Sequence, residues 1–126
     1  MRFMMLMFPK GYESVKPGTR PAPAMMAYNT ELKKAGVLLA LDGLHSPALG
    51  ARISFEGGKA TVTDGPFAEA KEVVGGYWMI QVKSREEAIA WASRCPAGEN
   101  EMIEVRQVQE WSDFPADVQE ALKPAA

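Results

Sequence analysis

Residues 64–78 read Asp-Gly-Pro-Phe-Ala-Glu-Ala-Lys-Glu-Val-Val-Gly-Gly-Tyr-Trp, and they join a tight turn, a charged segment and a glycine pair between two predicted strands. Pro66 fixes its own φ and keeps Gly65 out of the helical region, so the first strand is expected to end abruptly at Asp64. The Asp64 carboxylate then either accepts hydrogen bonds from nearby backbone N–H groups or serves as a functional group. The segment beyond it, anchored by Phe67, is predicted to be either a solvated surface or the lid of a cleft.

A β-hairpin is predicted immediately before this stretch. Residues 51–56 and 59–63 alternate between apolar and polar side chains and are joined by Gly57-Gly58, a pair typical of a tight two-residue turn. This register places Ile53 opposite Val62 on the apolar face. The hairpin is expected to bury that apolar face.

The open end of the hairpin is the clearest local indication of a site. The register places Asp64 opposite Ala51, and His45, the only histidine of the chain, lies in the loop just before it. Imidazole titrates near neutral pH and can act as a general acid or base, and a carboxylate can orient it. His45 and Asp64 are therefore predicted to be a catalytic pair, with a plain surface histidine as the alternative.

The rest of the chain alternates strands with helices. Residues 2–8 are apolar on both faces, which is typical of a strand covered on both sides. Residues 84–87 read Ser-Arg-Glu-Glu, a capping box that starts a helix ending before Pro96. The other predicted elements are a helix over residues 24–35 that ends at Gly36, a buried strand over 37–41, strands over 77–82 and 102–108, and a tail over 110–126 with a short helix.

Two of these strands carry candidate binding residues. Side chains alternate along a strand, so Tyr77 and Trp78 point to opposite faces; together with Phe67 they are predicted to enclose an apolar ligand. Glu104 and Arg106 share one face of the last strand. They form either a surface ion pair or, if that face is concave, a site in which Arg106 holds an anionic substrate.

Composition narrows the class of protein. A chain of 126 residues fits one domain, and a net charge of −2 gives no electrostatic basis for binding nucleic acid or an anionic membrane. The single cysteine, Cys95, excludes an intramolecular disulfide and suits a reducing cytoplasm. The apolar start of the chain is too short to span a membrane. One histidine and scattered carboxylates lack the spacing of metal ligands, and no cofactor fingerprint is present, so neither metal nor cofactor is predicted.

The order of elements matches the split β-α-β plan of a ferredoxin-like α+β domain over residues 1–109, with the hairpin inserted between its halves. Two helices on one face of the sheet leave the other face bare. Because residues 2–8 are apolar on that face too, we expect a homodimer in which two sheets close on each other as a dimeric α/β barrel.

The chain resembles the YCII-related, or DGPF-domain, proteins. The resemblance rests on residues 64–69 (Asp-Gly-Pro-Phe-Ala-Glu), 75–78 (Gly-Gly-Tyr-Trp), 91–96 (Trp-Ala-Ser-Arg-Cys-Pro) and 103–106 (Ile-Glu-Val-Arg), and it spans roughly residues 2–109. It implies a dimeric ferredoxin-like barrel similar to muconolactone isomerases, in a small bacterial protein of unassigned activity. Some relatives are fused to, or encoded near, sigma factors of the extracytoplasmic-function type.

The resemblance also implies a His and Asp pair in the cleft, which YCII-type relatives are proposed to use. This chain has no histidine in its first predicted helix and no aspartate in residues 94–96. The pair of His45 and Asp64 is the replacement that this sequence offers. Three functions follow as hypotheses: an acid/base enzyme, a non-catalytic ligand-binding module, and a protein-interaction module linked to sigma-factor regulation.

Overall fold

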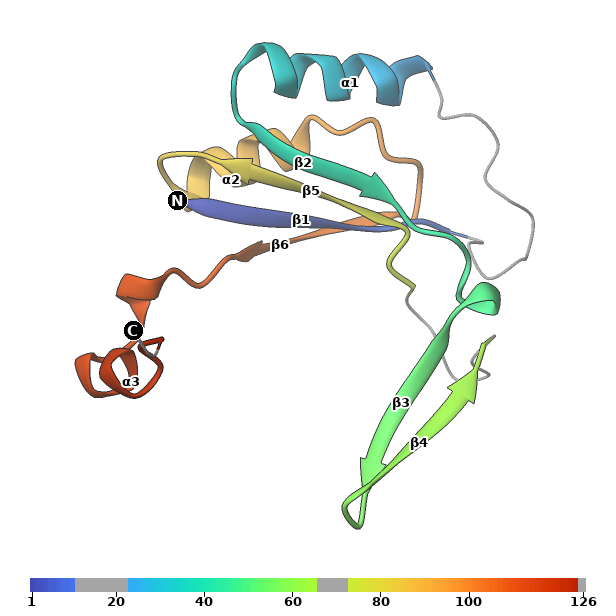
Figure 1. Ribbon diagram of the computed structural model, residues 1–126. Coiled ribbons are helices and arrows are strands. Elements are labelled where there is room, and N and C mark those ends of the chain that lie inside the picture. Colours follow the sequence, from blue (N-terminus) through green and yellow to red (C-terminus); the bar gives the residue numbers. More distant parts are fainter. Residues whose placement is uncertain (11–22, 66–72, 125–126) are drawn as a thin grey trace.

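The computed structural model describes residues 1–10, 23–65 and 73–124, and it contains a four-stranded antiparallel sheet in the order β2-β5-β1-β6 (Figure 1). Helices α1 and α2 cover one face of this sheet, and β3 and β4 form a separate two-stranded sheet. The elements are β1 (Arg2–Phe8), α1 (Pro23–Lys34), β2 (Leu38–Gly43), a 3₁₀ turn η1 (Pro47–Leu49), β3 (Ala51–Glu56), β4 (Lys59–Asp64), β5 (Gly76–Gln81), α2 (Arg85–Ser93), β6 (Met102–Gln107), a second 3₁₀ turn η2 (Trp111–Asp113) and α3 (Ala116–Ala121).

The strand order is consistent with the predicted ferredoxin-like split β-α-β plan. Strand β1 lies inside the sheet, where it pairs antiparallel with β5 on one side and with β6 on the other. Strand β2 pairs with the far side of β5, and the β3–β4 hairpin is inserted between these two strands in the sequence. The plan therefore brings the end of β2 and the start of β5 side by side.

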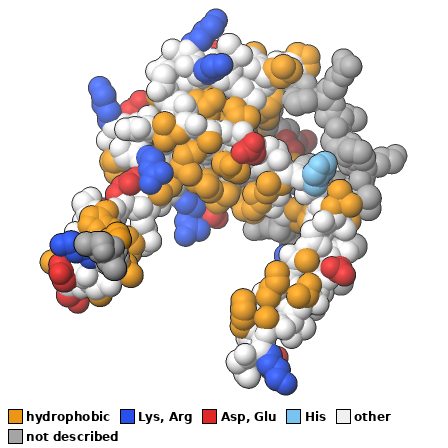
Figure 2. Space-filling model, in the orientation of Figure 1, with side chains coloured by type: hydrophobic (Ala, Val, Ile, Leu, Met, Phe, Trp, Pro, Cys, Tyr) orange, Lys and Arg blue, Asp and Glu red, His pale blue; other side chains and the backbone are white. Residues whose placement is uncertain are grey.

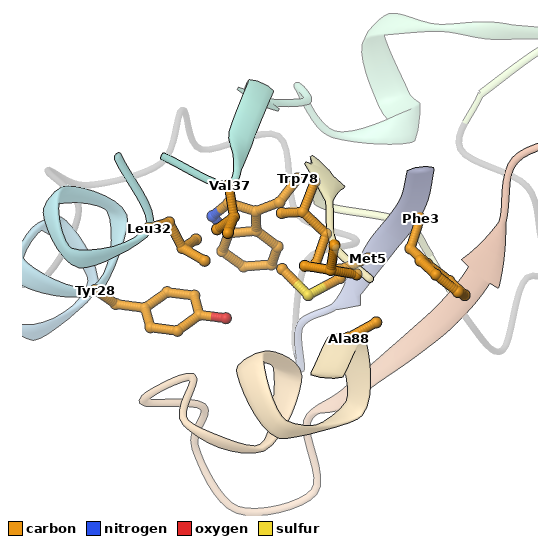
Figure 3. Packing of buried hydrophobic residues seen from close by; sticks show 9 residues of the cluster. Phe3, Met5, Tyr28, Leu32, Val37, Trp78 and Ala88 are labelled. Atoms are coloured by element: carbon orange, nitrogen blue, oxygen red, sulfur yellow. The ribbon is translucent and has the colours of Figure 1, made fainter. Parts of the chain in front are cut away.

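The core lies between the sheet and its two helices (Figure 3). Alternation along β1 turns Phe3 and Met5 toward the helices, and both are almost completely buried. Trp78 from β5 meets Tyr28 from α1 edge to face, with ring centroids 5.7 Å apart. The Tyr28 hydroxyl donates a 2.6 Å hydrogen bond to the carbonyl of Trp91 and so ties α1 to α2. This side of the sheet is a packed interior.

The predicted end of the first helix and the predicted start of the second helix are confirmed. Helix α1 ends at Lys34, and Gly36 follows with φ of +73°, a left-handed conformation that favours glycine. The Ser84 hydroxyl accepts a hydrogen bond from the Glu87 N–H at 3.1 Å, as a helix N-cap should. The Glu87 carboxylate reaches back to the N–H of Lys83 rather than to that of Ser84.

The prediction of a second buried strand over residues 37–41 was wrong. Strand β2 is an edge strand, and the side chains of Leu39 and Leu41 are 48% and 36% exposed. The register shifts between Leu38 and Ala40, which leaves Leu39 without a partner on β5. An apolar run of this length cannot by itself distinguish a central strand from an edge strand.

The hairpin has the predicted register but not the predicted burial. Ile53 lies opposite Val62, and both Gly57 and Gly58 have positive φ, as a type I′ turn requires. Every residue of β3 and β4 is exposed, and Phe55 retains 79% of its accessible surface. The hairpin projects away from the four-stranded sheet instead of packing on it (Figure 1), so the other described residues leave its apolar face uncovered.

The C-terminal segment is tied to the sheet by one ion pair. The Arg2 guanidinium donates to both oxygens of the Glu110 carboxylate, at 2.7 and 3.1 Å. These hydrogen bonds lower the pKa of Glu110 below its usual value. Beyond it, Trp111 and Phe114 contact each other edge to face, at 6.3 Å between ring centroids. The start of the tail is therefore held by β1 of the same chain.

Candidate functional site

A cavity of about 210 Å³ lies where β2 ends and β5 begins, beneath α1. Three glycines, Gly43, Gly75 and Gly76, form part of its wall, and because they carry no side chains the space stays open. Gly76 is also required by the close approach of the strands, since an added Cβ would lie 2.8 Å from the carbonyl oxygen of Asp42. The other lining residues are Met7, Met25, Asn29, Leu41, Asp42, Tyr77 and Trp78.

The amide of Asn29 is the first polar group of this cavity. Asn29 lies one helical turn after Met25, so both side chains reach the cavity from the same face of α1. Its Oδ1 accepts a 2.7 Å hydrogen bond from the indole N–H of Trp78. An indole can only donate, so the Nδ2 amino group of Asn29 must point away from it. Asn29 is thus a hydrogen-bond donor whose orientation the core fixes.

Asp42 and Tyr77 form a polar pair beside the cavity, on the face of the sheet opposite to Trp78. The two residues are register partners on β2 and β5, and the Tyr77 hydroxyl donates a 2.6 Å hydrogen bond to the Asp42 Oδ2. This bond to a carboxylate raises the pKa of Tyr77, so the phenol stays protonated at neutral pH. Of the described residues that line the cavity, Asp42 alone is charged. The cavity therefore disfavours an anionic guest.

A second hollow, of about 320 Å³, lies next to the first along the same two chain segments. Its lining includes His45, Arg52 and Val73. The Ser46 hydroxyl beside His45 caps η1 by accepting a hydrogen bond from the N–H of Ala48 at 3.2 Å. The backbone of Leu44 bonds to that of Gly75 and so holds the two segments together.

The predicted pair of His45 and Asp64 shares this end of the hairpin without a mutual bond. Asp64 is opposite Ala51, as predicted, and Ala51 lines the hollow that contains His45. Both side chains are exposed. Within residues 1–10, 23–65 and 73–124, no hydrogen bond or ion pair joins the imidazole to the Asp64 carboxylate. A role for the two residues in catalysis stays a prediction.

Gly65, which follows β4 directly, holds the base of the hairpin. Its N–H donates to the carbonyl of Gly50 at 3.0 Å, and a Cβ at this position would lie only 1.7 Å from the carbonyl oxygen of Pro47. Only a glycine fits so close to η1. Gly65 thus has a structural use that is visible in the packing.

The other predicted binding residues fall on different sides of the sheet. Trp78 points into the core with 6% exposure, while Tyr77 lies on the opposite face of β5; both still border the first cavity. Arg106 is on the face that no helix covers and pairs with Glu104 at 3.3 Å. This is the predicted surface ion pair, and a role for Arg106 as an anion clamp stays a prediction. Phe67 lies outside the described residues.

The described residues contain no candidate metal site, and the thiol of Cys95 is not an activated nucleophile. In the described ranges, no cluster of three or more His, Cys, Asp or Glu residues could hold a metal ion. Burial, with a smaller contribution from Glu101, raises the pKa of Cys95 to about 11, so its thiol stays protonated. No helix among the described residues is long and apolar enough to cross a membrane.

Two residues of the first cavity, Asn29 and Asp42, were not singled out by the sequence analysis. Asn29 had a detectable signal, because it is a polar residue beside the core-facing Tyr28 and Leu32 on an amphipathic helix. Asp42 precedes Gly43 and was interpreted as part of a loop, since Asp-Gly is a common turn sequence. The structure instead places Asp42 within β2.

The structure is a mixed α+β domain, consistent with a ferredoxin-like fold, with a small partly open cavity at the strand ends. The family model of the YCII-related domain matches residues 1–112. The chain therefore belongs to the YCII-related family, as its sequence motifs predicted. A comparison with curated proteins finds no match.

Proposed function

We propose that this YCII-related domain binds a small, neutral molecule in the cavity between α1, β2 and β5. The observation that carries the proposal is the Asn29 amide, which the Trp78 indole fixes with its amino group turned away from the core. A fixed donor beside the apolar side chains of Met7, Met25 and Leu41 selects a ligand that has an acceptor at one end. The proposal is thus a ligand-binding module with defined polarity.

The size and charge of the cavity limit the ligand. A dry cavity of roughly 150 Å³ accepts benzene, so one of about 210 Å³ suits a molecule slightly larger than benzene. The Asp42 carboxylate repels anions, and the protonated Tyr77 hydroxyl is already engaged with it. A compact apolar body with a carbonyl or similar oxygen fits these limits best.

Acetophenone and ethylbenzene test this chemistry, because they have nearly the same shape and only the first carries an acceptor. Nuclear magnetic resonance of the Trp78 indole N–H reports directly on the bond to Asn29. We expect acetophenone to shift this signal at roughly fivefold lower concentration than ethylbenzene, since one net hydrogen bond contributes about 1 kcal/mol. If neither compound shifts the signal at millimolar concentration, the proposal is wrong.

Asn29→Asp is the matched variant. It keeps an oxygen that can accept from the Trp78 indole and removes the amino group that would donate to the ligand. We expect the preference for acetophenone over ethylbenzene to disappear in this variant, while the indole signal remains in its hydrogen-bonded position. If Asn29→Asp still preferred acetophenone over ethylbenzene, the hydrogen-bond donor to the ligand would be a group other than the Asn29 amide.

An acid/base reaction at His45 is the second candidate. It is supported by the position of His45 in the hollow next to the cavity, where an imidazole could reach a bound molecule. Acetophenone binding by His45→Ala distinguishes binding from catalysis. Unchanged binding is expected if the cavity acts alone, whereas a large loss would place His45 in the ligand site.

We further propose that the domain is a cytoplasmic homodimer whose sheets pack face to face. Met4, Leu6 and Phe8 project from β1 on the face opposite to the helices, and this face keeps partly exposed apolar side chains. This apolar row is flanked on β6 by the Arg106–Glu104 pair, and apolar side chains grouped in this way are typical of a surface that a partner covers. Sedimentation of the wild-type protein at micromolar concentration is expected to give the mass of two chains, and a single-chain mass would contradict the proposal.

A further inference from the structure

The β3–β4 hairpin carries an uncovered apolar face. Ile53, Phe55 and Val62 point to the same side of the hairpin and are 52%, 79% and 65% exposed. The opposite side presents polar residues such as Ser54 and Thr61. An isolated two-stranded hairpin is at best marginally stable in water. Here the other described residues of the chain leave the apolar face of the hairpin exposed, so they add little to its stability. Figure 2 shows hydrophobic side chains along the projecting arm.

The base of the hairpin is closely packed against η1. Gly65 bonds to Gly50 and packs against the backbone of Pro47 too tightly to accept even a methyl group. Strands β3 and β4 pair only with each other within the described part of the chain. The arm extends past the face of the main sheet that no helix covers (Figure 1).

The area that a stable dimer buries indicates which partner covers the apolar face of the hairpin. A strand of about six residues covers roughly 95 Å², given a spacing of about 4.8 Å and a rise of about 3.3 Å per residue. The four-stranded face thus offers on the order of 400 Å², about half of the ~800 Å² that each partner buries in a standard interface. In a dimer with two-fold symmetry, the hairpin of each chain would contact the other chain, so each chain takes part in two hairpin contacts. Each contact buries about 200 Å² on that chain, the area of two strands. The total then comes close to 800 Å² per chain.

We infer that the apolar face of the hairpin packs on a second copy of this chain and that the hairpin serves as a dimerisation arm. This inference rests on the proposed homodimer. The same chain supplies both apolar surfaces, the sheet face around Leu6 and the hairpin face around Phe55, and two-fold symmetry covers both at once. The arm supplies about half of the contact area.

A pair of neighbouring substitutions tests the arm. Phe55→Asp places a charge on the apolar face, and Ser54→Asp places the same charge on the polar face one residue away. Sedimentation over a dilution series measures the dissociation constant of the dimer. We expect this constant to be at least tenfold higher than that of the wild type for Phe55→Asp and within twofold of it for Ser54→Asp. Equal dimerisation by both variants and the wild type would overturn the arm but leave the dimer standing.

Hydrogen exchange tests the same contact without altering the hairpin. Leu6→Asp places a charge in the sheet face and is expected to give a monomer. The hairpin amides should exchange slowly in the wild-type dimer and at least tenfold faster in Leu6→Asp. Hairpin exchange that is equally fast in both would overturn the inference and leave the apolar face to another partner. A wild-type protein that is monomeric throughout would overturn the proposed dimer together with the arm.

Discussion

The β1–β5 and β3–β4 ladders are built alike and end up in opposite environments. Each is antiparallel and contains six partner pairs. In the first, Phe3, Met5 and Ile80 are at most 2% exposed beneath the helices, whereas in the second Phe55 is 79% exposed. The backbone bonds are equivalent, so the difference in stability between the two ladders must come from what covers their side chains.

The largest expected effect is on the covered ladder. Ile80→Ala removes buried methyl groups from the centre of the core and is expected to lower the free energy of unfolding by about 2–5 kcal/mol. Phe55→Ala, measured in the monomeric Leu6→Asp background, should change it by less than about 0.5 kcal/mol, because an exposed side chain has little to lose. Urea unfolding measures both. Similar losses at the two positions would show that the hairpin is packed within one chain.

The next effect concerns the junction between the two regions. Gly65→Ala would place a methyl group against the Pro47 carbonyl, and such overpacking is expected to cost about 1–3 kcal/mol. Gly43→Ala is the matched control, since a Cβ there meets nothing within 4 Å. Thermal unfolding compares the two variants. If Gly65→Ala melts like Gly43→Ala, the hairpin base is not rigid and the direction of the arm is not set by it.

The smallest expected effect is that of the exposed Arg2–Glu110 pair, which holds the tail to β1. The pKa of Glu110 is lowered in the folded chain, so its contribution to stability is present above the unfolded value of about 4.3 and is lost as the pH falls through the folded pKa. Glu110→Gln should therefore be slightly less stable than wild type at pH 7, and this difference in stability should shrink as the pH falls below about 4. A difference that does not change with pH would assign the effect to packing instead of charge.

The sequence was most informative where a local rule determines the structure. The cap at Ser84, the stop at Gly36 and the Gly57-Gly58 turn depend on short-range chemistry, and all three were predicted correctly. Burial was harder, because alternation identifies the apolar face of the hairpin but not what covers it. The edge position of β2 also depends on pairing over a long distance in the sequence.

The candidate site likewise combines residues that the local sequence indicated with residues that only long-range packing brings together. Tyr77 and Trp78 were predicted to enclose an apolar ligand together with Phe67; both border the cavity, and their role in binding stays a prediction. Asn29 reaches the same cavity from a helix almost fifty residues earlier, and only the packing of α1 on β5 brings it there. Catalysis by His45 and Asp64, an anion-binding role for Arg106 and the sigma-factor link stay predictions.

Native mass spectrometry of the gently purified protein tests the central claim most directly, because one spectrum reports both the subunit count and any retained small molecule. We expect a dimer of the wild-type protein that carries a small added mass. We also expect a dimer of Asn29→Asp in which a smaller fraction of the protein carries this mass. A bare monomer of the wild-type protein would contradict both the dimer and the ligand site.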